Sequence, residues 1–600
     1  MKIKTILAAM AVVMAAGCAK EQGGEVSGQT AAPQILAEMA EQPATRTCID
    51  SDALVAGENT AVLWMPGDQL GVFTSGSSNV LYTNDEQTEN IPNASFSSDA
   101  TVSGDVQYAY YPYDAANDGK AATALTGTIP AEQTMGQAIP ADYKYGQLKA
   151  VTADGGYKFK FHNMFSLVRF KIDATGTALE GQTLESVKLT VTRGDAAVPV
   201  TGGFTFSATD GTYTLGTTSN VLTTTWSETL DGAVSSFASV FPEVRSGDVL
   251  NFEIKAGAYT ATLSVTSKAN FAAGMYYTFP LTLANFSGLK VEKTVSGTFT
   301  AATYNVDGLG LSAINSDGPG SNGTKNISSK IASDTWDFMG FSEDFSFHDE
   351  LVSNMSGFTF GTYRGDIENY MSALFGTVYD TDGLGFATRN STCSFANETI
   401  VQYTSSAGGV TQGANTCIKK GFRYYLVTLQ DGIQVDVLIT HMNTYGEGDR
   451  YNAQHAQLQQ VAEYIVDNLK KNNRPIIFMG DTNLRYTRHD FETYFWSILR
   501  NANLTYADPW VTYQWAGVYP TYPSNSLMVS DATGTSSSDI ICETTQKGEV
   551  VDKIIYINNP DAVVQINANN YLRDYDGYNG FGDHMPIVSE FSYSGTITVE

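Results

Sequence analysis

Cysteine, basic residues and long hydrophobic runs are scarce in this 600-residue chain, and each shortage excludes a class of protein. Five cysteines are too few for a disulfide scaffold. Lys and Arg total 35 against 63 Asp and Glu, and the net charge of −28 disfavours a protein that holds nucleic acid through a broad basic face. The charged fraction of 16% and the aromatic fraction of 12% exclude a disordered chain. At roughly 150 residues per domain, the length predicts about four units.

The longest apolar run lies at the N-terminus, from Ile6 to Ala16, and follows the basic residues Lys2 and Lys4. This run is shorter than the roughly 20 residues of a membrane-spanning helix and is typical of a secretory signal. No other stretch is long and apolar enough to span a membrane. The chain outside the cytoplasm should therefore begin shortly after residue 17.

The sequence Ala15-Ala16-Gly17-Cys18 resembles a bacterial lipobox, in which Leu usually stands at the position of Ala15. The resemblance implies a signal peptide over residues 1–17, cleavage before Cys18 and lipidation of the Cys18 thiol. Residues 18–44 then comprise the lipidated cysteine and a small, polar tether. The implied location is the outer membrane or cell surface, with contact to the membrane through the lipid anchor. An ordinary signal peptide with a chance cysteine is the alternative.

Residues 45–290 are predicted to be all-β. Short β-branched or alternating runs recur between Gly, Asp, Asn, Ser and Thr, and this spacing is typical of β-sandwiches. We expect two sandwiches, over residues 45–175 and 176–290. The runs are Ala61–Trp64, Gln69–Phe73, Gln107–Tyr111, Tyr157–His162, Leu167–Ile172, Ser186–Thr192, Val249–Ile254 and Thr260–Val265.

Four motifs in this region resemble the fimbrillin-like lipoproteins of Bacteroidota: Thr45-Arg46-Thr47, the segment from Trp64 to Phe73, Tyr110-Tyr111-Pro112-Tyr113 and Phe161-His162-Asn163-Met164. The resemblance implies two β-sandwich domains at the cell surface, with contact to glycan or protein as a possible role. A generic β-spacer is the alternative, and neither interpretation assigns chemistry to these residues.

The pattern changes in residues 291–600, where strands alternate with helix. A helix is predicted from Arg450 to Lys470, because Ala453, Ala456, Val461, Ile465 and Leu469 recur near helical spacing. Strands mixed with helices indicate a layered α/β domain of about 300 residues. The predicted strands are Thr298–Asn305, Trp336–Phe341, Tyr424–Leu429, Val435–His441, Pro475–Gly480 and Lys553–Ile557.

Polar residues repeatedly follow these apolar strands, which is where layered α/β folds place reactive groups. Their carboxylate and amide oxygens suit Mg²⁺, Mn²⁺ or Ca²⁺, whereas no His-x-x-x-His or cysteine cluster favours zinc. Their two imidazoles can take a proton from water and deliver one to a leaving oxygen. The set therefore predicts phosphoester hydrolysis. It comprises Asn305, Glu343, His441, Asp481, Asn483, Asp552, Asp583 and His584.

The order of this set resembles the endonuclease/exonuclease/phosphatase superfamily, whose deoxyribonuclease-I-like fold is a four-layered α/β sandwich. The resemblance implies a divalent-cation site, Mg²⁺ foremost, at Asn305, Glu343 and Asp583. It implies that Asp481 and Asn483 orient water and hold the phosphate. It further implies that His584 is the general base, that Asp552 orients it, and that His441 stabilises or protonates the leaving group.

Three motifs depart from the family pattern: Ser342 replaces the usual Gln, Thr482 the usual Phe and Lys553 a common His. None removes a functional atom, so the departures bear on substrate rather than on activity. A metal-dependent phosphodiesterase with nuclease-like activity is the first expectation, and a sphingomyelinase-like or phosphatase activity on lipid or small phosphoesters is the alternative. A non-catalytic fimbrillin-like adhesin is a further alternative, which the completeness of the polar set disfavours.

Overall fold

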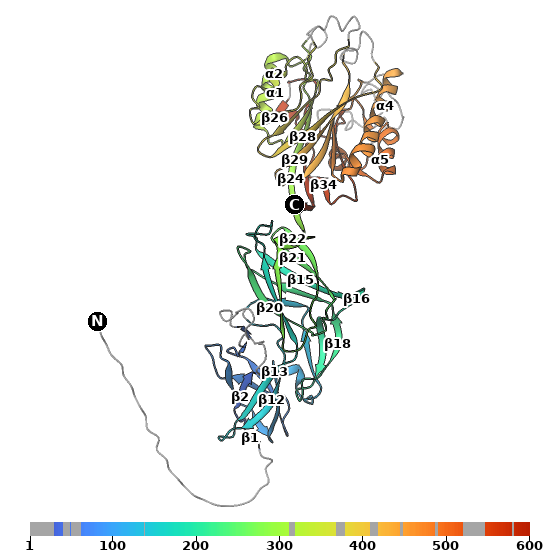
Figure 1. The fold of residues 1–600 in the computed structure, drawn as a ribbon. Coiled ribbons are helices and arrows are strands. Elements are labelled where there is room, and N and C mark those ends of the chain that lie inside the picture. The colour runs from blue at the N-terminus through green and yellow to red at the C-terminus, as the bar shows by residue number, and fades with distance from the viewer. Residues whose placement is uncertain are drawn as a thin grey trace, which may run out of the picture. The chain divides into compact units, whose positions relative to one another are not determined.

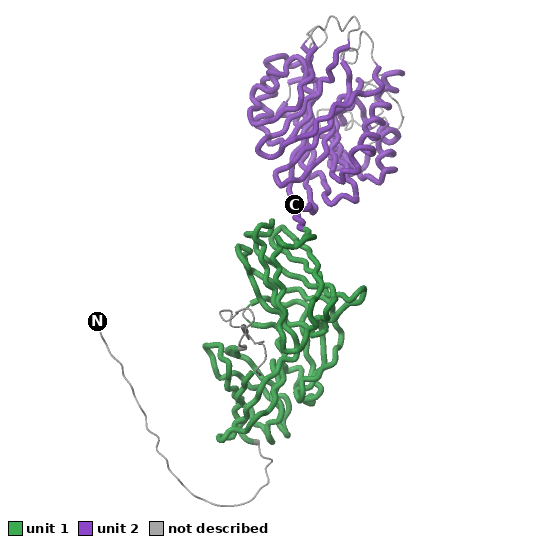
Figure 2. The backbone as a smooth tube through the Cα atoms, in the orientation of Figure 1, with its two compact units in different colours: residues 1–290 green, residues 291–600 purple. Residues whose placement is uncertain are grey.

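The computed structural model describes residues 29–39, 48–49, 62–136, 138–310, 318–367, 378–407, 418–444, 448–486, 490–519, 546–578 and 581–599. The predicted signal peptide, Cys18 and residues 19–28 and 40–44 of the predicted tether lie outside these residues, whereas residues 29–39 of that tether contain two strands. The chain divides into two compact units, residues 1–290 and 291–600, which Figure 2 colours separately. Within the described residues, no helix is long and apolar enough to cross a membrane.

Unit 1 begins with a closed barrel rather than the sandwich predicted for residues 45–175. Alternation of apolar and polar residues is the same in both architectures, so the sequence pattern does not separate them. Trp64, Phe96 and Phe161 fill the barrel interior, with ring centroids 5.1 and 5.2 Å from that of Trp64. In order around the barrel the strands are β12 (Lys144–Val151), β13 (Tyr157–Asn163), β2 (Ile35–Met39), β7 (Asn93–Ser97), β6 (Val80–Asn84), β5 (Gln69–Thr74) and β9 (Val106–Tyr111).

The second part of unit 1 is a sandwich. Its two main sheets pack through Phe170, Phe252 and Phe279, whose ring centroids lie 5.3 to 6.3 Å apart. One sheet comprises β20 (Val234–Val240), β14 (Ser166–Asp173) and β23 (Tyr276–Thr282). The other contains β11 (Glu132–Thr134), β19 (Val221–Thr225), β15 (Leu184–Arg193), β21 (Val249–Ala256) and β22 (Tyr259–Thr266), with β16 (Ala196–Ala197) beside β15.

The predicted division at residue 175 does not separate these two parts. In a smaller sheet, β17 (Thr201–Phe206) pairs with β10 (Leu125–Ile129) on one side and with β18 (Tyr213–Ser219) on the other. Strand β11 pairs with β19, and β14 pairs with β20 and β23. Strands from before residue 175 are therefore built into the sandwich, because pairing follows long-range register that local patterns do not encode. Two short pairs complete the unit: β1 (Gln29–Ala31) with β8 (Thr101–Ser103), and β3 (Cys48–Ile49) with β4 (Val62–Leu63).

Unit 2 contains two sheets with helices on their outer faces, so the predicted layered α/β domain is confirmed (Figure 1). The first sheet contains β24 (Lys290–Asn305), β25 (Phe338–Ser342), β27 (Gly385–Arg389) and β26 (Phe358–Phe360), with β36 (Ile587–Val599), β34 (Val564–Ala568) and β35 (Leu572–Arg573) on the other side of β24. The second contains β28 (Cys393–Gln402), β29 (Gly421–Leu429), β30 (Gln434–His441), β31 (Ile476–Asp481), β33 (Asp552–Asn558) and β32 (Thr505–Ala507).

Both faces of strand β24 are buried from Ala301 to Asn305, and alternate residues there face different layers. Phe299 and Ala301 join the core that contains the second sheet, whereas Ala302 and Tyr304 join the core beneath the first pair of helices. That pair is α1 (Gly320–Ser333) and α2 (His348–Val352). The other sheet is covered by α4 (Asp449–Tyr464), which continues as Ile465–Leu469 and Lys470–Asn472 and confirms the predicted helix, and by Glu492–Trp496 running into α5 (Ser497–Asn501). Shorter helices are α6 (Pro509–Gln514) and α8 (Tyr575–Tyr578).

Candidate active site

Strand pairing brings the predicted site residues to one edge of each sheet in unit 2. In the first sheet β24 runs parallel to β25, so Asn305 lies opposite Ser342 and Glu343 follows directly. In the second sheet β30 runs parallel to β31 and places His441 opposite Asp481, while β33 places Asp552 opposite Asp481 from the other side. Parallel strands end at the same edge, so buried apolar strands carry their terminal polar residues to one place.

Asn305 connects the two sheets through its side chain. Its Nδ2 donates to Glu343 Oε1 at 3.3 Å and to Asp481 Oδ2 at 3.1 Å, and its Oδ1 accepts from the backbone N–H of Asp307. Asp481 also accepts from the backbone N–H of Asn483 at 2.9 Å. Three carboxylates thus share the site with an amide: Glu343, Asp481 and Asp552.

His584 and Asp552 form a close pair, with His584 Nδ1 donating to Asp552 Oδ2 at 2.6 Å. Burial alone would lower the pKa of His584, but the Asp552 carboxylate, with Asp481 and Asp583 nearby, raises it well above its usual value. The bond fixes the proton on Nδ1 and leaves Nε2 as the reactive nitrogen. Nε2 lies 3.9 Å from Asp583 Oδ1, and the Asp583 side chain is largely exposed.

His441 is the opposite case. It is 1% exposed, and neither ring nitrogen has a hydrogen-bond partner among the described residues. Its Nε2 lies 3.6 Å from Asp481 Oδ2 and 3.9 Å from Glu343 Oε1, distances too long for hydrogen bonds. Burial, with Lys420 nearby, lowers the pKa of His441 to about 3, so the ring is neutral. A buried neutral imidazole without partners can donate one hydrogen bond and accept another from a ligand.

The donor set fits a hard divalent cation. Asp481, Asp552 and His584 each offer a ligand atom, and these atoms lie within 4.8 Å of one another. Asp552 Oδ1 is buried without a partner among the described residues. Burial, with Asp307 nearby, raises the pKa of Glu343 to about 7. Carboxylate and amide oxygens are the ligands that Mg²⁺, Mn²⁺ and Ca²⁺ prefer. The predicted ligand set of Asn305, Glu343 and Asp583 stays a prediction, and the compact set found here overlaps the predicted catalytic residues instead.

Buried amides hold the loops around the site. Gln454 Nε2 donates to the carbonyl oxygens of Asn443 and Asn483, and Gln457 Oε1 accepts from the backbone N–H of Asn443. The Asn483 side chain donates to the Met442 carbonyl at 3.2 Å. Sequence reasoning did not single out Lys420, which is 1% exposed and donates to the same carbonyl at 2.6 Å. The one signal for it was a lysine directly before a buried strand.

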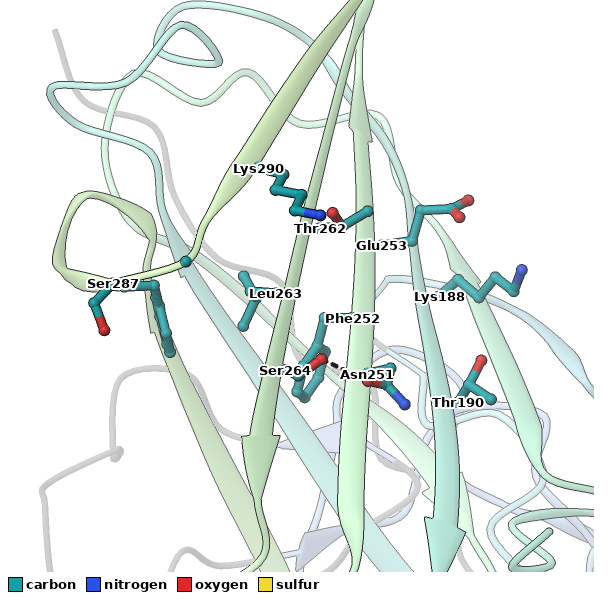
Figure 3. Close-up of a pocket in the computed structure, with 12 residues that line it drawn as sticks. Lys188, Thr190, Asn251, Phe252, Glu253, Thr262, Leu263, Ser264, Ser287 and Lys290 are labelled. Carbon is teal, nitrogen blue, oxygen red and sulfur yellow. Dashed lines mark hydrogen bonds between the residues drawn. The ribbon is translucent and has the colours of Figure 1, made fainter. Parts of the chain in front are cut away.

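A separate hollow lies in unit 1, on the outer face of the sheet containing β15, β21 and β22 (Figure 3). It has a volume of about 490 Å³ and is lined by polar side chains from adjacent strands, with Phe286 and Lys290 beside them. The residues that line it include no histidine or cysteine, so the hollow lacks the imidazole groups found at the strand ends of unit 2.

Comparisons with known proteins find different similarities for different parts of the chain. Residues 45–301 match the family model described as fimbrillin-like. The N-terminal region is fimbrillin-like. The fimbrillin-like match ends at residue 301, within strand β24. It assigns no reaction.

The other half of the chain is similar to different proteins. The sphingomyelinase of Mycobacterium bovis is 26% identical over 315 residues, which cover 52% of this chain and 56% of that protein. The chain therefore spans about half the length of the curated relatives it matches. Similar solved structures include the human Nocturnin catalytic domain with bound sulfate anion (17% identity, TM-score 0.33, covering 51% of this chain and 97% of that one). Another is an endonuclease/exonuclease/phosphatase family protein from Bacteroides thetaiotaomicron (14% identity, TM-score 0.32, 50% and 96%).

Proposed function

We propose that residues 291–600 form a divalent-cation-dependent phosphodiesterase. The observation that carries the proposal is the pairing of His584 with Asp552 at 2.6 Å, at the edge of the sheets where buried His441 has no hydrogen-bond partner among the described residues. The sphingomyelinase similarity over this half of the chain supports the same reaction class.

The reaction is in-line attack by water on phosphorus. Asp552 keeps the proton on Nδ1 of His584, so Nε2 receives the proton that water gives up. A raised pKa lets the imidazole hold that proton once it is taken. Neutral His441 donates a hydrogen bond to the leaving oxygen, and Asn483 with Asp481 orients the phosphate. A cation held by Glu343 and its neighbours would supply charge neutralisation on the phosphoryl oxygens.

The substrate we favour is a lipid phosphodiester of the sphingomyelin type. The curated relatives are sphingomyelinases, and a net charge of −28 opposes tight binding to a polyanion. Nuclease-like activity, the first expectation from the sequence, takes second place for the same two reasons. An acidic enzyme that meets a single phosphate through a cation avoids the repulsion that a nucleic acid would cause along its length.

We also propose that the chain is lipid-anchored outside the cytoplasm through Cys18. In cells fed a radiolabelled fatty acid, the wild-type chain is expected to carry label and to fractionate with membranes. Cys18→Ala is expected to lose the label and appear in the soluble fraction. Label retained by Cys18→Ala would contradict the anchor while leaving the reaction untouched.

The reaction is tested with the purified chain against sphingomyelin vesicles, duplex DNA and a chromogenic phosphodiester. We expect release of phosphocholine from the vesicles in Mg²⁺, loss of that release in EDTA, and recovery on adding Mg²⁺ back. Faster cleavage of DNA than of sphingomyelin would overturn the substrate but keep the phosphodiesterase. No hydrolysis of any of the three, with any of Mg²⁺, Mn²⁺ and Ca²⁺, would favour a non-catalytic adhesin.

A further inference from the structure

A lysine, an asparagine and an aspartate meet inside the barrel of unit 1. Lys144 begins β12 and lies directly opposite Asn163 at the end of β13 in the antiparallel register. Residues opposite each other on neighbouring strands present their side chains on the same face. Phe159 and Phe161 lie on the same face of β13 as Asn163, because residues two apart on a strand share a face. Both are part of the barrel core, so this face is the interior.

The contacts of the Lys144 amine are short and specific. Nζ donates to Asn163 Oδ1 at 2.5 Å and to the Asp142 carboxylate. Tyr111 lies opposite Lys144 on β9, and the centroid of its ring is 6.0 Å from Lys144 Nζ. The Lys144 side chain is 0% exposed and that of Asp142 is 3% exposed. The amine is thus within hydrogen-bond distance of both the carboxamide and the carboxyl group, and the amine and the carboxyl group are shielded from bulk water.

The backbone places the aspartate there at a cost. Ala141, directly before Asp142, has φ of +51°, a conformation that residues with a Cβ rarely adopt. Such strain persists only where the surrounding structure holds it, and it gathers at functional positions. The strained turn aims the Asp142 carboxyl back at Lys144, two residues later.

Burial also sets the protonation of the pair. It lowers the pKa of Lys144, against the pull of Asp142 and Asp68, and it raises the pKa of Asp142, against the pull of Lys144. Both changes favour a neutral amine beside a neutral carboxylic acid. A neutral amine is the nucleophilic form of lysine, and a carboxylic acid can donate a hydrogen bond to an amide carbonyl.

We propose that Lys144 and Asn163 become joined by an intramolecular amide bond, formed with the help of Asp142. Lys144 Nζ attacks Asn163 Cγ, so an N–C bond forms and the C–Nδ2 bond breaks. The Asp142 acid gives its proton to Nδ2, which leaves as ammonia, and takes back a proton from Nζ. One ammonia is released per bond, and no oxidant or reductant takes part.

The bond ties β12 to β13 inside the fimbrillin-like region. A covalent link between two strands restricts the unfolded chain in the way a disulfide does, and it needs no oxidising compartment. The barrel is thereby fastened without using any of the five cysteines.

A second lysine in the same unit serves as an internal control. Lys120 Nζ also donates to an asparagine, Asn117 Oδ1, at 3.1 Å. Its other partner is the hydroxyl of Thr126 at 2.7 Å, in the place of a carboxyl group. No carboxyl group is among the hydrogen-bond partners of Lys120 in the described residues, so Lys120 is expected to keep its free amine.

The test is peptide mass spectrometry of the full chain after denaturation and digestion with trypsin. Acylated lysine is not cleaved, so the expected product joins residues 121–149 to residues 161–169 and is lighter than the two peptides by one ammonia. Recovery of free peptide 121–144 together with unmodified 161–169 would overturn the proposal. This readout on the wild-type chain does not depend on how any variant folds.

Variants then assign the roles. Lys144→Arg and Asp142→Asn are both expected to abolish the joined peptide, although Asp142→Asn keeps both reacting residues. Lys120→Arg is expected to leave it unchanged. A joined peptide at wild-type yield in Asp142→Asn would overturn the part played by the acid.

Discussion

Among the described residues both units contain buried polar atoms without partners, but in unit 1 they are hydroxyl and guanidinium atoms, whereas in unit 2 they include His441 and Asp552. In unit 1 Gln133 satisfies its side chain against the backbone of Ser239 in both directions, at 2.8 and 2.9 Å, and Lys144 has two oxygen partners. In unit 2 both ring nitrogens of His441 and one oxygen of Asp552 are buried without partners among the described residues. Since an unsatisfied buried polar group costs about 1–3 kcal/mol, these groups mark a place that stability alone does not explain.

Non-glycine residues with positive φ occur in both units. Asp307, Glu343 and Asn483 all have positive φ near 50–58° and lie beside the strand ends of unit 2. In the described part of unit 1 the non-glycine residues with positive φ are Asn79 and Ala141. Asparagine tolerates this conformation, whereas Ala141 stands beside the Lys144 cluster. In the described part of unit 2, three of the seven non-glycine residues with positive φ lie at the site, whereas Asn397, Asn473, Asn503 and Ala516 lie elsewhere.

The largest effect is expected from the His584–Asp552 pair. Asp552→Asn leaves the shape but cannot hold the proton on Nδ1, and His584→Ala removes the base. Each should lower kcat by roughly 10³ to 10⁴, with circular dichroism and the unfolding midpoint preserved. Because the two act as a unit, the double variant should lose no more than the worse single one. Additive losses would show that they act separately.

A second histidine–aspartate pair in unit 2 is the matched control. His455 Nε2 lies 2.9 Å from Asp490 Oδ1, on helix α4 rather than at a strand end. His455→Ala should change the unfolding midpoint and leave kcat unaltered. If it lowered kcat as far as His584→Ala does, the contrast between a pairing histidine and a catalytic one would fail.

The next effect compares two glycines on paired strands. Gly480 has φ of +135°, and a Cβ there would lie 2.0 Å from the carbonyl oxygen of Thr440, its partner on β30. Gly480→Ala must therefore push apart the strands that carry His441 and Asp481. We expect a loss of about 2 kcal/mol or more in the free energy of unfolding and roughly 10² in kcat.

Gly71 in the barrel offers the same crowding without the chemistry. A Cβ at Gly71 would lie 2.0 Å from the buried ring of its partner Tyr110. Gly71→Ala should lower the stability of unit 1 by about 1–3 kcal/mol in urea unfolding and leave hydrolysis intact. Equal losses of hydrolysis from both variants would mean that the two units cannot be compared as separate bodies.

Much of unit 2 was predictable because its strands and its long helix have clear periodicity. The strands predicted to end at Asn305, His441 and Gly480 each end within one residue of the prediction, although β24 begins eight residues earlier than predicted. Their order in the sheets then brought the polar residues together, because parallel neighbours end at one edge. Which oxygen faces which nitrogen was not predictable, since it depends on register between two sheets and on side-chain rotamers. The isolation of His441 is such a feature.

Unit 1 was less predictable for a physical reason. Alternating strands fit a barrel or a sandwich equally well, and the choice depends on which strands pair far along the chain. The pairing of β11 with β19 joins residues about ninety positions apart. The Lys144 cluster escaped notice for the same reason, because Lys144 and Asn163 have no motif in common and meet through register alone.

The smallest effect compares two buried glutamines that bridge backbone groups. Gln454 holds the carbonyls of Asn443 and Asn483 beside the site, so Gln454→Ala should lower kcat by about tenfold through misplaced loops. Gln133 holds Ser239 within unit 1, so Gln133→Ala should cost about 1–3 kcal/mol of stability and leave kcat unchanged. Steady-state hydrolysis and urea unfolding of both variants separate the two outcomes. Two buried glutamines would then have different roles: Gln454 positions loops at the active site, whereas Gln133 stabilises unit 1. The difference follows from the backbone groups that each glutamine bonds. Loss of kcat in Gln133→Ala would break the comparison, because it would mean that the chemistry of unit 2 depends on packing inside unit 1.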